Sequence, residues 1–244
     1  RDYGGEDNQI GQEQTPEEYI QQLVEVFREV RNILTDDGTL WVNIGDSYYN
    51  YRPGKAYVKQ TVASNRQDLP EYSPKRSNKL DGYKEKDLIG IPWMLAFALR
   101  SDGWYLRQDI IWNKPNPMPE SVRDRCTKSH EYIFLLSKSQ NYYFDVDVIK
   151  ETTRRKRSVW NIQTKPYRGS HFAVYPPELI EPCILAGSEV GDIVLDPFMG
   201  SGTTAAVAKS LGRDYIGCEL HEDYGNLIKK RVAEYHPVTE VTQS

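Results

Sequence analysis

The sequence predicts an α/β fold with a Rossmann-like sheet, mixed but mostly parallel, and helices on both of its faces. A buried apolar strand, a glycine turn and the start of a helix follow one another within residues 192–204. A second short strand, at 215–218, ends directly before the acidic residue Glu219. Helical and strand patterns alternate through the rest of the chain, and its 244 residues suit one domain with a substantial core.

The first helix is expected after an opening loop rich in Gly, Asn and Asp. Residues 15–18, Thr-Pro-Glu-Glu, form a capping box with proline at the first helical position. Apolar residues then recur at helical spacing from Ile20 to Leu34, which predicts an amphipathic helix with one buried face.

A strand at residues 39–44 should follow. Asp46 comes just after this strand, at the end where open α/β sheets place their binding sites. It has two open interpretations, a carboxylate that faces a ligand or the cap of a turn or helix. The polar stretch 49–86 is long for a connection within a compact domain, which indicates a functional insertion loop or partial disorder.

The middle of the chain should contain one helix and three strands. The helix starts at Asp87, and two strands follow at 104–112 and 130–137. Residues 142–145 are expected to form the hairpin partner of the second strand, because antiparallel strands are common at one edge of a mixed sheet. Four apolar side chains should form the buried side of the helix: Leu88, Ile91, Leu95 and Leu99.

The carboxyl-terminal part begins with the most basic window of the chain. Residues 150–168 contain seven Lys or Arg and a single Glu. Helices are then expected within 171–185 and from about residue 221 to residue 234, with the glycine turn and the strand that precedes Glu219 between them.

The net charge, the absence of long apolar runs and the cysteine spacing limit the classes of protein that the sequence could represent. The net charge is −4, so contact with a nucleic acid would rely on local basic patches. Neither a membrane-spanning run nor a secretory signal is visible. The three cysteines lack disulfide or metal spacing, and no metal is expected. Cys183 and Cys218 lie in apolar segments, which indicates core thiols in a reducing compartment.

The glycine turn is the chief indication of a ligand site. Gly200 and Gly202 let the backbone approach a ligand, and one of the threonines after them can cap the next helix. Glu219 follows at about the spacing of a ribose-binding carboxylate, roughly 20 residues. The turn lacks the Gly-Lys-Ser/Thr ending of a phosphate loop. These features favour an adenosine-containing ligand without phosphates over an ordinary structural turn.

Residues 196–204, Asp-Pro-Phe-Met-Gly-Ser-Gly-Thr-Thr, with the strand that ends in Glu, resemble the S-adenosylmethionine motif of DNA amino-methyltransferases. These enzymes methylate the exocyclic N4 of cytosine or N6 of adenine. The similarity extends back to residue 171 without a break, and further similar blocks lie at 1–48, 100–121 and 130–145. The cofactor motif comes last in the chain, which resembles the circularly permuted β class of this family.

The resemblance implies one methyltransferase domain over 1–244, with an incomplete amino terminus and the methyltransferase fold. Segment 146–170 would contact DNA and recognise the target, and 171–235 would form the cofactor-binding half. Glu219 would hold the ribose hydroxyls, and Leu220 or His221 would flank the adenine. The residues expected around S-adenosyl-L-methionine are His171, Phe172, Ala173, Asp196, Phe198, Gly200, Ser201, Gly202, Thr203, Thr204, Glu219 and Leu220.

Contact with DNA is expected from side chains in three segments. Charge runs are commonly solvated faces, and this alternative stays open for the 49–86 insertion. For the arginines of the basic window, the position between the catalytic and cofactor halves favours contact with the DNA backbone. The candidates are Lys75, Arg76, Lys114, Asn116, Arg154, Arg155 and Arg157.

The catalytic tetrapeptide of the family, Ser/Asp/Asn-Pro-Pro-Tyr, is absent from the 244 residues and is expected upstream of Arg1. An inactive, degenerate homologue is the alternative. Within the chain, Asp46 is the candidate to face the target base. The base would leave the duplex stack, and its amino nitrogen would attack the sulfonium methyl in line, with no covalent intermediate. The opening Arg-Asp-Tyr-Gly resembles the continuation that often follows the Ser form, which favours N4 of cytosine over N6 of adenine.

The implied partners are double-stranded DNA, a cognate restriction endonuclease and a second copy of the chain, with no membrane. The expected location is the cytoplasm of a prokaryote or phage-infected cell, in association with the nucleoid, or the nucleus of a eukaryote. Two rival classes remain: a methyltransferase that acts on RNA or a small molecule, and a catalytically inactive DNA-binding protein.

Overall fold

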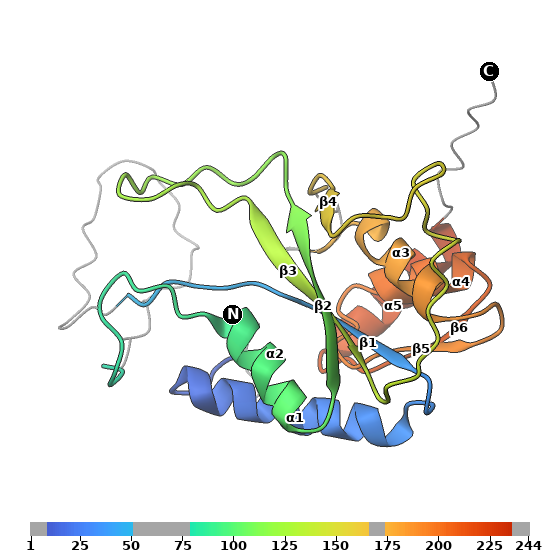
Figure 1. The fold of residues 1–244 in the computed structure, drawn as a ribbon, viewed down its shortest axis with the longest axis horizontal. Helices are drawn as coiled ribbons and strands as arrows, with labels where there is room; N and C mark the ends of the chain where they lie inside the picture. The colour runs from blue at the N-terminus through green and yellow to red at the C-terminus, as the bar shows by residue number, and fades with distance from the viewer. Residues whose placement is uncertain (1–8, 51–78, 166–173, 236–244) are drawn as a thin grey trace.

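The computed structural model describes residues 9–50, 79–165 and 174–235, and the statements below concern these residues. They form five helices and six strands (Figure 1). The helices are α1 Pro16–Ile33, α2 Ile91–Ser101, α3 Pro177–Gly187, α4 Thr203–Ser210 and α5 Glu222–Glu234. The strands are β1 Thr39–Ile44, β2 Tyr105–Asn113, β3 His130–Ser137, β4 Val159–Asn161, β5 Ile193–Asp196 and β6 Asp214–Gly217.

The strands form a four-stranded sheet in the order β1-β3-β2-β4 and a separate pair, β5-β6. β3 is antiparallel to both β1 and β2, whereas β4 is parallel to β2 and β6 is parallel to β5. The mixed α/β architecture is therefore confirmed. The parallel share is smaller than expected, because β2 and β3 follow one another without the crossover helix that parallel neighbours require.

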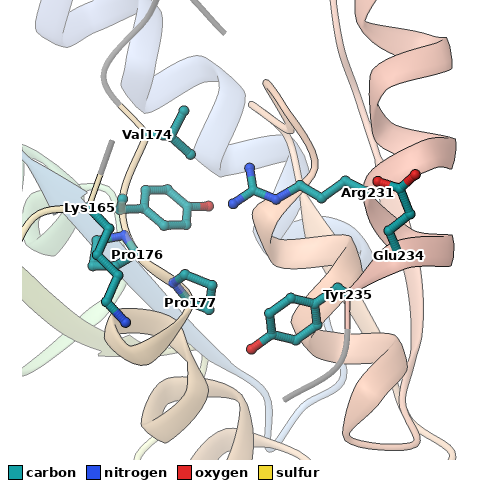
Figure 2. Close-up of a pocket in the computed structure, with 8 residues that line it drawn as sticks. Lys165, Val174, Pro176, Pro177, Arg231, Glu234 and Tyr235 are labelled. Atoms are coloured by element: carbon teal, nitrogen blue, oxygen red, sulfur yellow. The ribbon is translucent and has the colours of Figure 1, made fainter. Parts of the chain in front are cut away.

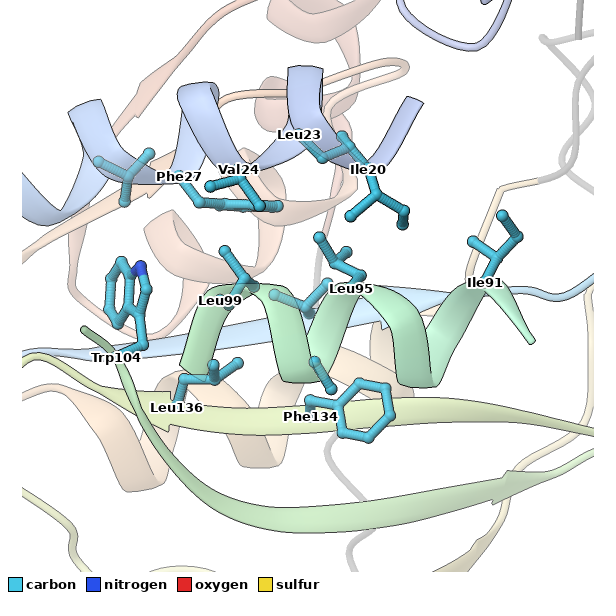
Figure 3. Packing of buried hydrophobic residues seen from close by; sticks show 13 residues of the cluster. Ile20, Leu23, Val24, Phe27, Ile91, Leu95, Leu99, Trp104, Phe134 and Leu136 are labelled. Atoms are coloured by element: carbon cyan, nitrogen blue, oxygen red, sulfur yellow. The ribbon is translucent and has the colours of Figure 1, made fainter. Parts of the chain in front are cut away.

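Helices α1 and α2 cover one face of the four-stranded sheet (Figure 3). Helix α1 begins with the predicted capping box, in which the Glu18 N–H donates to Thr15 Oγ1 at 3.1 Å and the Thr15 N–H donates to Glu18 Oε2 at 3.2 Å. The buried side chains of α1 and α2 pack with Phe134 and Leu136 of β3. Both the start of α1 and its apolar face agree with the sequence prediction.

Helix α3 covers the opposite face of this sheet. Trp41 and Val42 are neighbours on β1, yet Val42 packs in the α1–α2 cluster, while Trp41 packs with Leu179 and Cys183 of α3. Successive side chains of a strand point to opposite faces, so each strand serves both cores. Helices on both faces are thus confirmed.

The β5-β6 pair lies beside the larger sheet, with β5 near β1 (Figure 1). Val194 and Tyr215 pack against Val207 and Ala208 of α4. On the other face, Leu195 packs against the α1–α2 cluster. This packing brings the end of β5 close to α1. No helix in the described residues combines the length and apolar character needed to cross a membrane.

The start of α2 differs from the sequence prediction. The helix begins at Ile91 and not at Asp87, and Leu88, expected on its buried side, is 51% exposed. The Asp46 carboxylate accounts for the later start, because its Oδ1 accepts the N–H groups of Gly90 at 3.0 Å and Ile91 at 3.1 Å. A cap that comes from a distant loop leaves no mark in the local sequence.

Two further expectations are wrong. Residues 142–145 form no strand, because β3 already has β1 on one side and β2 on the other and offers no free edge to a hairpin partner. Cys183 is buried as predicted, but Cys218 is exposed, since it follows the short strand β6 at the edge of the molecule.

Candidate cofactor and DNA sites

The loop between β5 and α4 depends on two glycines with left-handed backbone conformations. Gly200 has φ +53° and Gly202 has φ +82°, values that other residues rarely adopt. A Cβ atom at Gly202 would also lie 3.1 Å from Ile228 of α5. Glycine at these positions therefore lets the chain turn directly into α4 while α5 packs against the turn.

Glu219 holds this loop against the end of β6. Its Oε2 accepts the N–H of Gly200 at 2.8 Å, and its Oε1 accepts the N–H of His221 at 3.0 Å. The Met199 N–H adds a bond to the carbonyl oxygen of Cys218 at 2.9 Å. Each carboxylate oxygen has a second lone pair, so Glu219 retains the capacity to accept a hydroxyl donor from a ligand.

Asp196 lies at the start of the same loop and has two occupied carboxylate oxygens. Its Oδ1 accepts the Phe198 N–H at 2.9 Å. Its Oδ2 accepts the hydroxyl of Thr204 and lies 3.3 Å from the hydroxyl of Tyr175. Tyr175 was not among the predicted site residues, because a tyrosine between a valine and two prolines carries no recognisable pattern.

The other predicted residues of the loop differ in their surroundings. Ser201 Oγ accepts a bond from Arg231 Nη1 at 2.5 Å, and both residues are buried. Thr203 Oγ1 is buried with no hydrogen-bond partner in the described residues, at the amino end of α4. Phe198 is 47% exposed, and its ring meets that of Phe27 of α1 edge-on at 6.2 Å.

Leu220 is 48% exposed, directly after Glu219. His221, the next residue, has a buried Nε2 without a hydrogen-bond partner in the described part of the chain. His171, Phe172 and Ala173 lie outside the described residues, as do Lys75 and Arg76 of the insertion.

The structure gives Asp46 the role of a long-range cap. Besides the two N–H groups at the start of α2, its Oδ1 accepts the N–H of Ser47 at 2.9 Å. Three backbone donors on one oxygen correspond to the capping interpretation of this residue. The carboxylate thereby joins the carboxyl end of β1 to the start of α2.

Two of the predicted DNA contacts have internal partners. Lys114 forms an ion pair with Glu131, and its Nζ lies 4.2 Å from the centre of the Trp112 ring. Asn116 donates to the carbonyl oxygen of Thr164 and accepts the Thr164 N–H, both at 3.0 Å. These side chains fasten the loop after β2 to the sheet and to the segment after β4.

The three predicted arginines of the basic window differ from Lys114 and Asn116 in their surroundings. Arg154, Arg155 and Arg157 are exposed, and none of them forms an ion pair within the described residues. Arg157 also lines a groove of about 880 Å³ along β4, together with Gln108, Lys156 and Asn161. The structure therefore leaves these arginines available to a polyanion, in contrast to Lys114 and Asn116.

The glycine loop, the carboxylates at the strand ends and the mixed sheet with helices on both faces are the features that the resemblance to methyltransferases leads us to expect. A family profile described as DNA methylase matches residues 3–230. The chain belongs to this family, whose members methylate adenine N6 or cytosine N4.

Individual relatives support the same family assignment. The chain is 53% identical to the type II methyltransferase M.SmaI of Serratia marcescens over 239 residues, which cover 95% of this chain and 80% of the relative. Among solved structures it resembles the cytosine-N4-specific PvuII DNA methyltransferase, with a TM-score of 0.70 and 18% identity over 93% and 74% of the two chains. It also resembles a Thermus thermophilus protein assigned as a DNA modification methylase, in complex with S-adenosyl-L-methionine, with a TM-score of 0.61 and 26% identity over 89% and 77%.

The protein is thus an S-adenosylmethionine-dependent DNA amino-methyltransferase. The described site fits this cofactor on its own observations. Glu219 retains acceptor capacity for ribose hydroxyls, Thr203 Oγ1 is buried without a partner in the described residues, and the glycine loop is free of side-chain bulk at Gly200. Phe198 and Leu220 add exposed apolar surface beside these polar groups.

Proposed function

We propose that the protein methylates the exocyclic N4 of cytosine within a specific sequence of double-stranded DNA. The observation that carries the choice of base is the opening Arg-Asp-Tyr-Gly, which resembles the continuation after the Ser form of the family tetrapeptide. N6 of adenine is the alternative, and the site described above serves either base. The likeness to the PvuII enzyme, at 18% identity, supports the fold alone.

The loop residues receive distinct roles in this proposal. The bound cofactor supplies an electrophilic methyl group on a sulfonium sulfur. Glu219 accepts the ribose hydroxyls with the lone pairs that its two backbone contacts leave, and Leu220 flanks the adenine. The glycine loop and the amino end of α4 would hold the methionine part, because the free N–H groups at the start of a helix favour the carboxylate of an amino acid. The set of residues around it is Asp196, Phe198, Gly200, Ser201, Gly202, Thr203 and Thr204.

Catalysis in this proposal relies on position and electrostatics. The target base would be rotated out of the stack, which would expose its amino nitrogen to the methyl group that the cofactor supplies. Asp46 contributes by holding the carboxyl end of β1 against α2, through its three backbone hydrogen bonds.

We place the DNA-contact surface on the basic segment that leads into β4. Arg154, Arg155 and Arg157 are exposed, and the adjacent groove along β4 presents the polar side chains of Gln108 and Asn161. Exposed guanidinium groups suit phosphates, while amides suit base edges. This assignment keeps 146–170 as the recognition segment and assigns structural roles to Lys114 and Asn116.

The proposal is tested with full-length enzyme, S-adenosyl-L-methionine and unmethylated DNA, followed by digestion to nucleosides and mass spectrometry. N4-methylcytosine is the expected product. N6-methyladenine would overturn the choice of base and leave the family and cofactor intact. Cofactor binding without any methylated nucleoside would favour the inactive, DNA-binding alternative, and methylation of RNA alone would favour the RNA enzyme.

The relatives are named as type II methyltransferases, which supports a restriction endonuclease as the functional partner of this protein. In that arrangement, DNA methylated by the enzyme resists the partner endonuclease, and unmethylated DNA is cut. A homodimer is the second proposed association. Sedimentation of the full-length protein with and without DNA would test it, with a single monomer boundary in both cases as the contrary result.

A further inference from the structure

Three side-chain oxygen atoms from three segments meet beside the glycine loop between β5 and α4, which we also call the cofactor loop. The Tyr175 hydroxyl lies 2.7 Å from Thr204 Oγ1 and 3.3 Å from Asp196 Oδ2, and Thr204 Oγ1 also bonds to Asp196 Oδ2. Tyr175 precedes α3, Asp196 ends β5 and Thr204 lies in the first turn of α4. The trio therefore joins the helix on the four-stranded sheet to both ends of the glycine loop.

The hydrogen-bonding capacities of the trio make Tyr175 and Thr204 the donors and Asp196 the acceptor. Asp196 only accepts, and its Oδ1 is already bonded to the Phe198 N–H. Thr204 donates to Oδ2, so the Tyr175 proton goes to Thr204 Oγ1 or, over the longer distance, to Oδ2. Without the tyrosine hydroxyl, Thr204 Oγ1 would lose its donor, and Asp196 would keep one hydroxyl contact in place of two.

The ring of Tyr175 has a separate role. It packs against the apolar cluster formed by Ile110, Trp112, Ile133, Trp160, Leu179 and Cys183. This cluster belongs to β2, β3, β4 and α3, and not to the β5-α4 unit. Tyr175 also lines a cavity with Arg231 of α5 and with Tyr235, the residue that follows this helix by one position (Figure 2). The side chain thus reaches from the core around α3 to the part of the molecule formed by α4 and α5.

We propose that Tyr175 is a positioning residue for cofactor binding, which fixes Asp196 and Thr204 relative to each other and so sets the shape of the loop that receives the methionine part of S-adenosylmethionine. Two other side chains also bond to the loop within the described residues, Glu219 to Gly200 and Arg231 to Ser201. Tyr175 is a third such side chain, at the base of the loop. The proposal concerns the affinity for the cofactor, and no part of the reaction passes through the phenol.

The ionisation of Tyr175 agrees with a purely donating role. Burial raises the pKa of its hydroxyl, and the negative charge of Asp196 raises it further, while the nearby Arg231 acts in the opposite direction. The phenol therefore stays protonated throughout the pH range in which such enzymes are assayed. A positioning effect of this kind should be independent of pH, unlike that of an acid or base.

The test is steady-state kinetics of Tyr175→Phe in the full-length enzyme. We expect KM for S-adenosylmethionine to rise about 10-fold, the change that corresponds to about 1.4 kcal/mol, with kcat and KM for DNA within about twofold of the original. Direct titration with S-adenosylhomocysteine should show the same loss of affinity. Tyr235→Phe is the matched control, because Tyr235 lines the same cavity and its hydroxyl makes no hydrogen bond within the described residues.

Variants at Thr204 separate positioning from a general loss of structure. Thr204→Val should reproduce the loss of affinity for S-adenosylmethionine, whereas Thr204→Ser, which keeps the hydroxyl, should retain the original affinity. The double variant Tyr175→Phe, Thr204→Val should lose no more affinity than the more strongly affected single variant. An unchanged KM for the cofactor in Tyr175→Phe would overturn the proposal. Strictly additive losses of affinity in the double variant would also overturn it. A parallel fall in kcat, DNA affinity and melting temperature would do the same, because it would indicate a structural role only. If Tyr175→Phe does not fold, the Thr204 pair decides by the same criteria.

Discussion

The cofactor loop and the region around β4 hold their functional side chains in different ways. In the loop, the two predicted carboxylates bond to backbone N–H groups over short stretches of the chain: Glu219 bonds to Gly200, and Asp196 bonds to Phe198. Around β4, the predicted side chains bond to more distant segments: Lys114 pairs with the Glu131 carboxylate, and Asn116 bonds to the backbone of Thr164. A site made of backbone groups is therefore visible in a local motif, whereas a surface made of side chains depends on which of them remain unpaired.

The largest expected effect follows from the double role of Glu219. Glu219→Ala removes the acceptor for the Gly200 and His221 N–H groups and, with it, the acceptor that we propose for the ribose hydroxyls. We expect KM for S-adenosylmethionine to rise about 100-fold, because hydrogen bonds to a charged group contribute about 1.5–3 kcal/mol. Isothermal titration and steady-state kinetics would measure it. Glu222→Ala, at an exposed position at the start of α5, is the control, and equal losses in both variants would contradict the assignment.

The second prediction sharpens the contrast between free and paired cations. The triple variant Arg154→Ala, Arg155→Ala, Arg157→Ala should bind DNA about 30-fold more weakly at low salt, and the slope of log K against log[salt] should fall by about 3, one unit for each lost phosphate contact. Fluorescence anisotropy over a salt series would measure both. Folding stability should stay the same, because these side chains are exposed.

Lys209→Ala is a control for the loss of positive charge, since Lys209 lies at the carboxyl-terminal end of α4 and pairs with Asp214. An unaltered salt slope in the triple variant would show that the basic segment is a solvated face and would move the DNA contact elsewhere.

The third prediction concerns the backbone of the loop. Gly202→Ala forces a side chain into a left-handed conformation and places its Cβ against Ile228, so the free energy of unfolding should fall by about 2 kcal/mol. Gly225→Ala is the control within α5, where a Cβ meets nothing within 4 Å. That substitution should stabilise the helix by about 0.5–1 kcal/mol. Urea unfolding of both variants measures the difference, and equal values would refute the backbone argument.

The smallest effect is expected for Lys114, whose ion pair with Glu131 should keep it from contacting DNA. Lys114→Met removes the cation over the Trp112 ring and leaves the partly buried Glu131 carboxylate without its cation, which should cost about 1 kcal/mol of stability. The salt slope of DNA binding should not change. Adding Glu131→Gln should recover most of the loss. A shallower salt slope in Lys114→Met would show that this lysine leaves its internal partner to contact DNA.

Sequence reasoning succeeded where a single element carries its own signal. The capping box at Thr15, the apolar face of α1 and the strand at Thr39–Ile44 all lie in the structure as predicted. It failed where a segment distant in the sequence decides whether a strand pairs, where a helix starts or whether a side chain is buried. The 142–145 segment has strand-forming residues, but its expected partner β3 already has β1 on one side and β2 on the other. Helix α2 starts late because Asp46, far away in the chain, caps it. Cys218 has apolar neighbours in sequence, yet it follows an exposed strand end.

The amino-acid sequence alone determined the fold class, because periodicity and caps are properties of short stretches, and its resemblance to a known motif indicated the family and a candidate cofactor loop. The tertiary structure alone decided which of the predicted contacts are already in use. It paired Lys114 with Glu131, set Asp46 on the start of α2, and brought Tyr175 to Asp196 and Thr204. Such pairings depend on distances between residues remote in sequence, and only the packing of two cores against one another sets those distances.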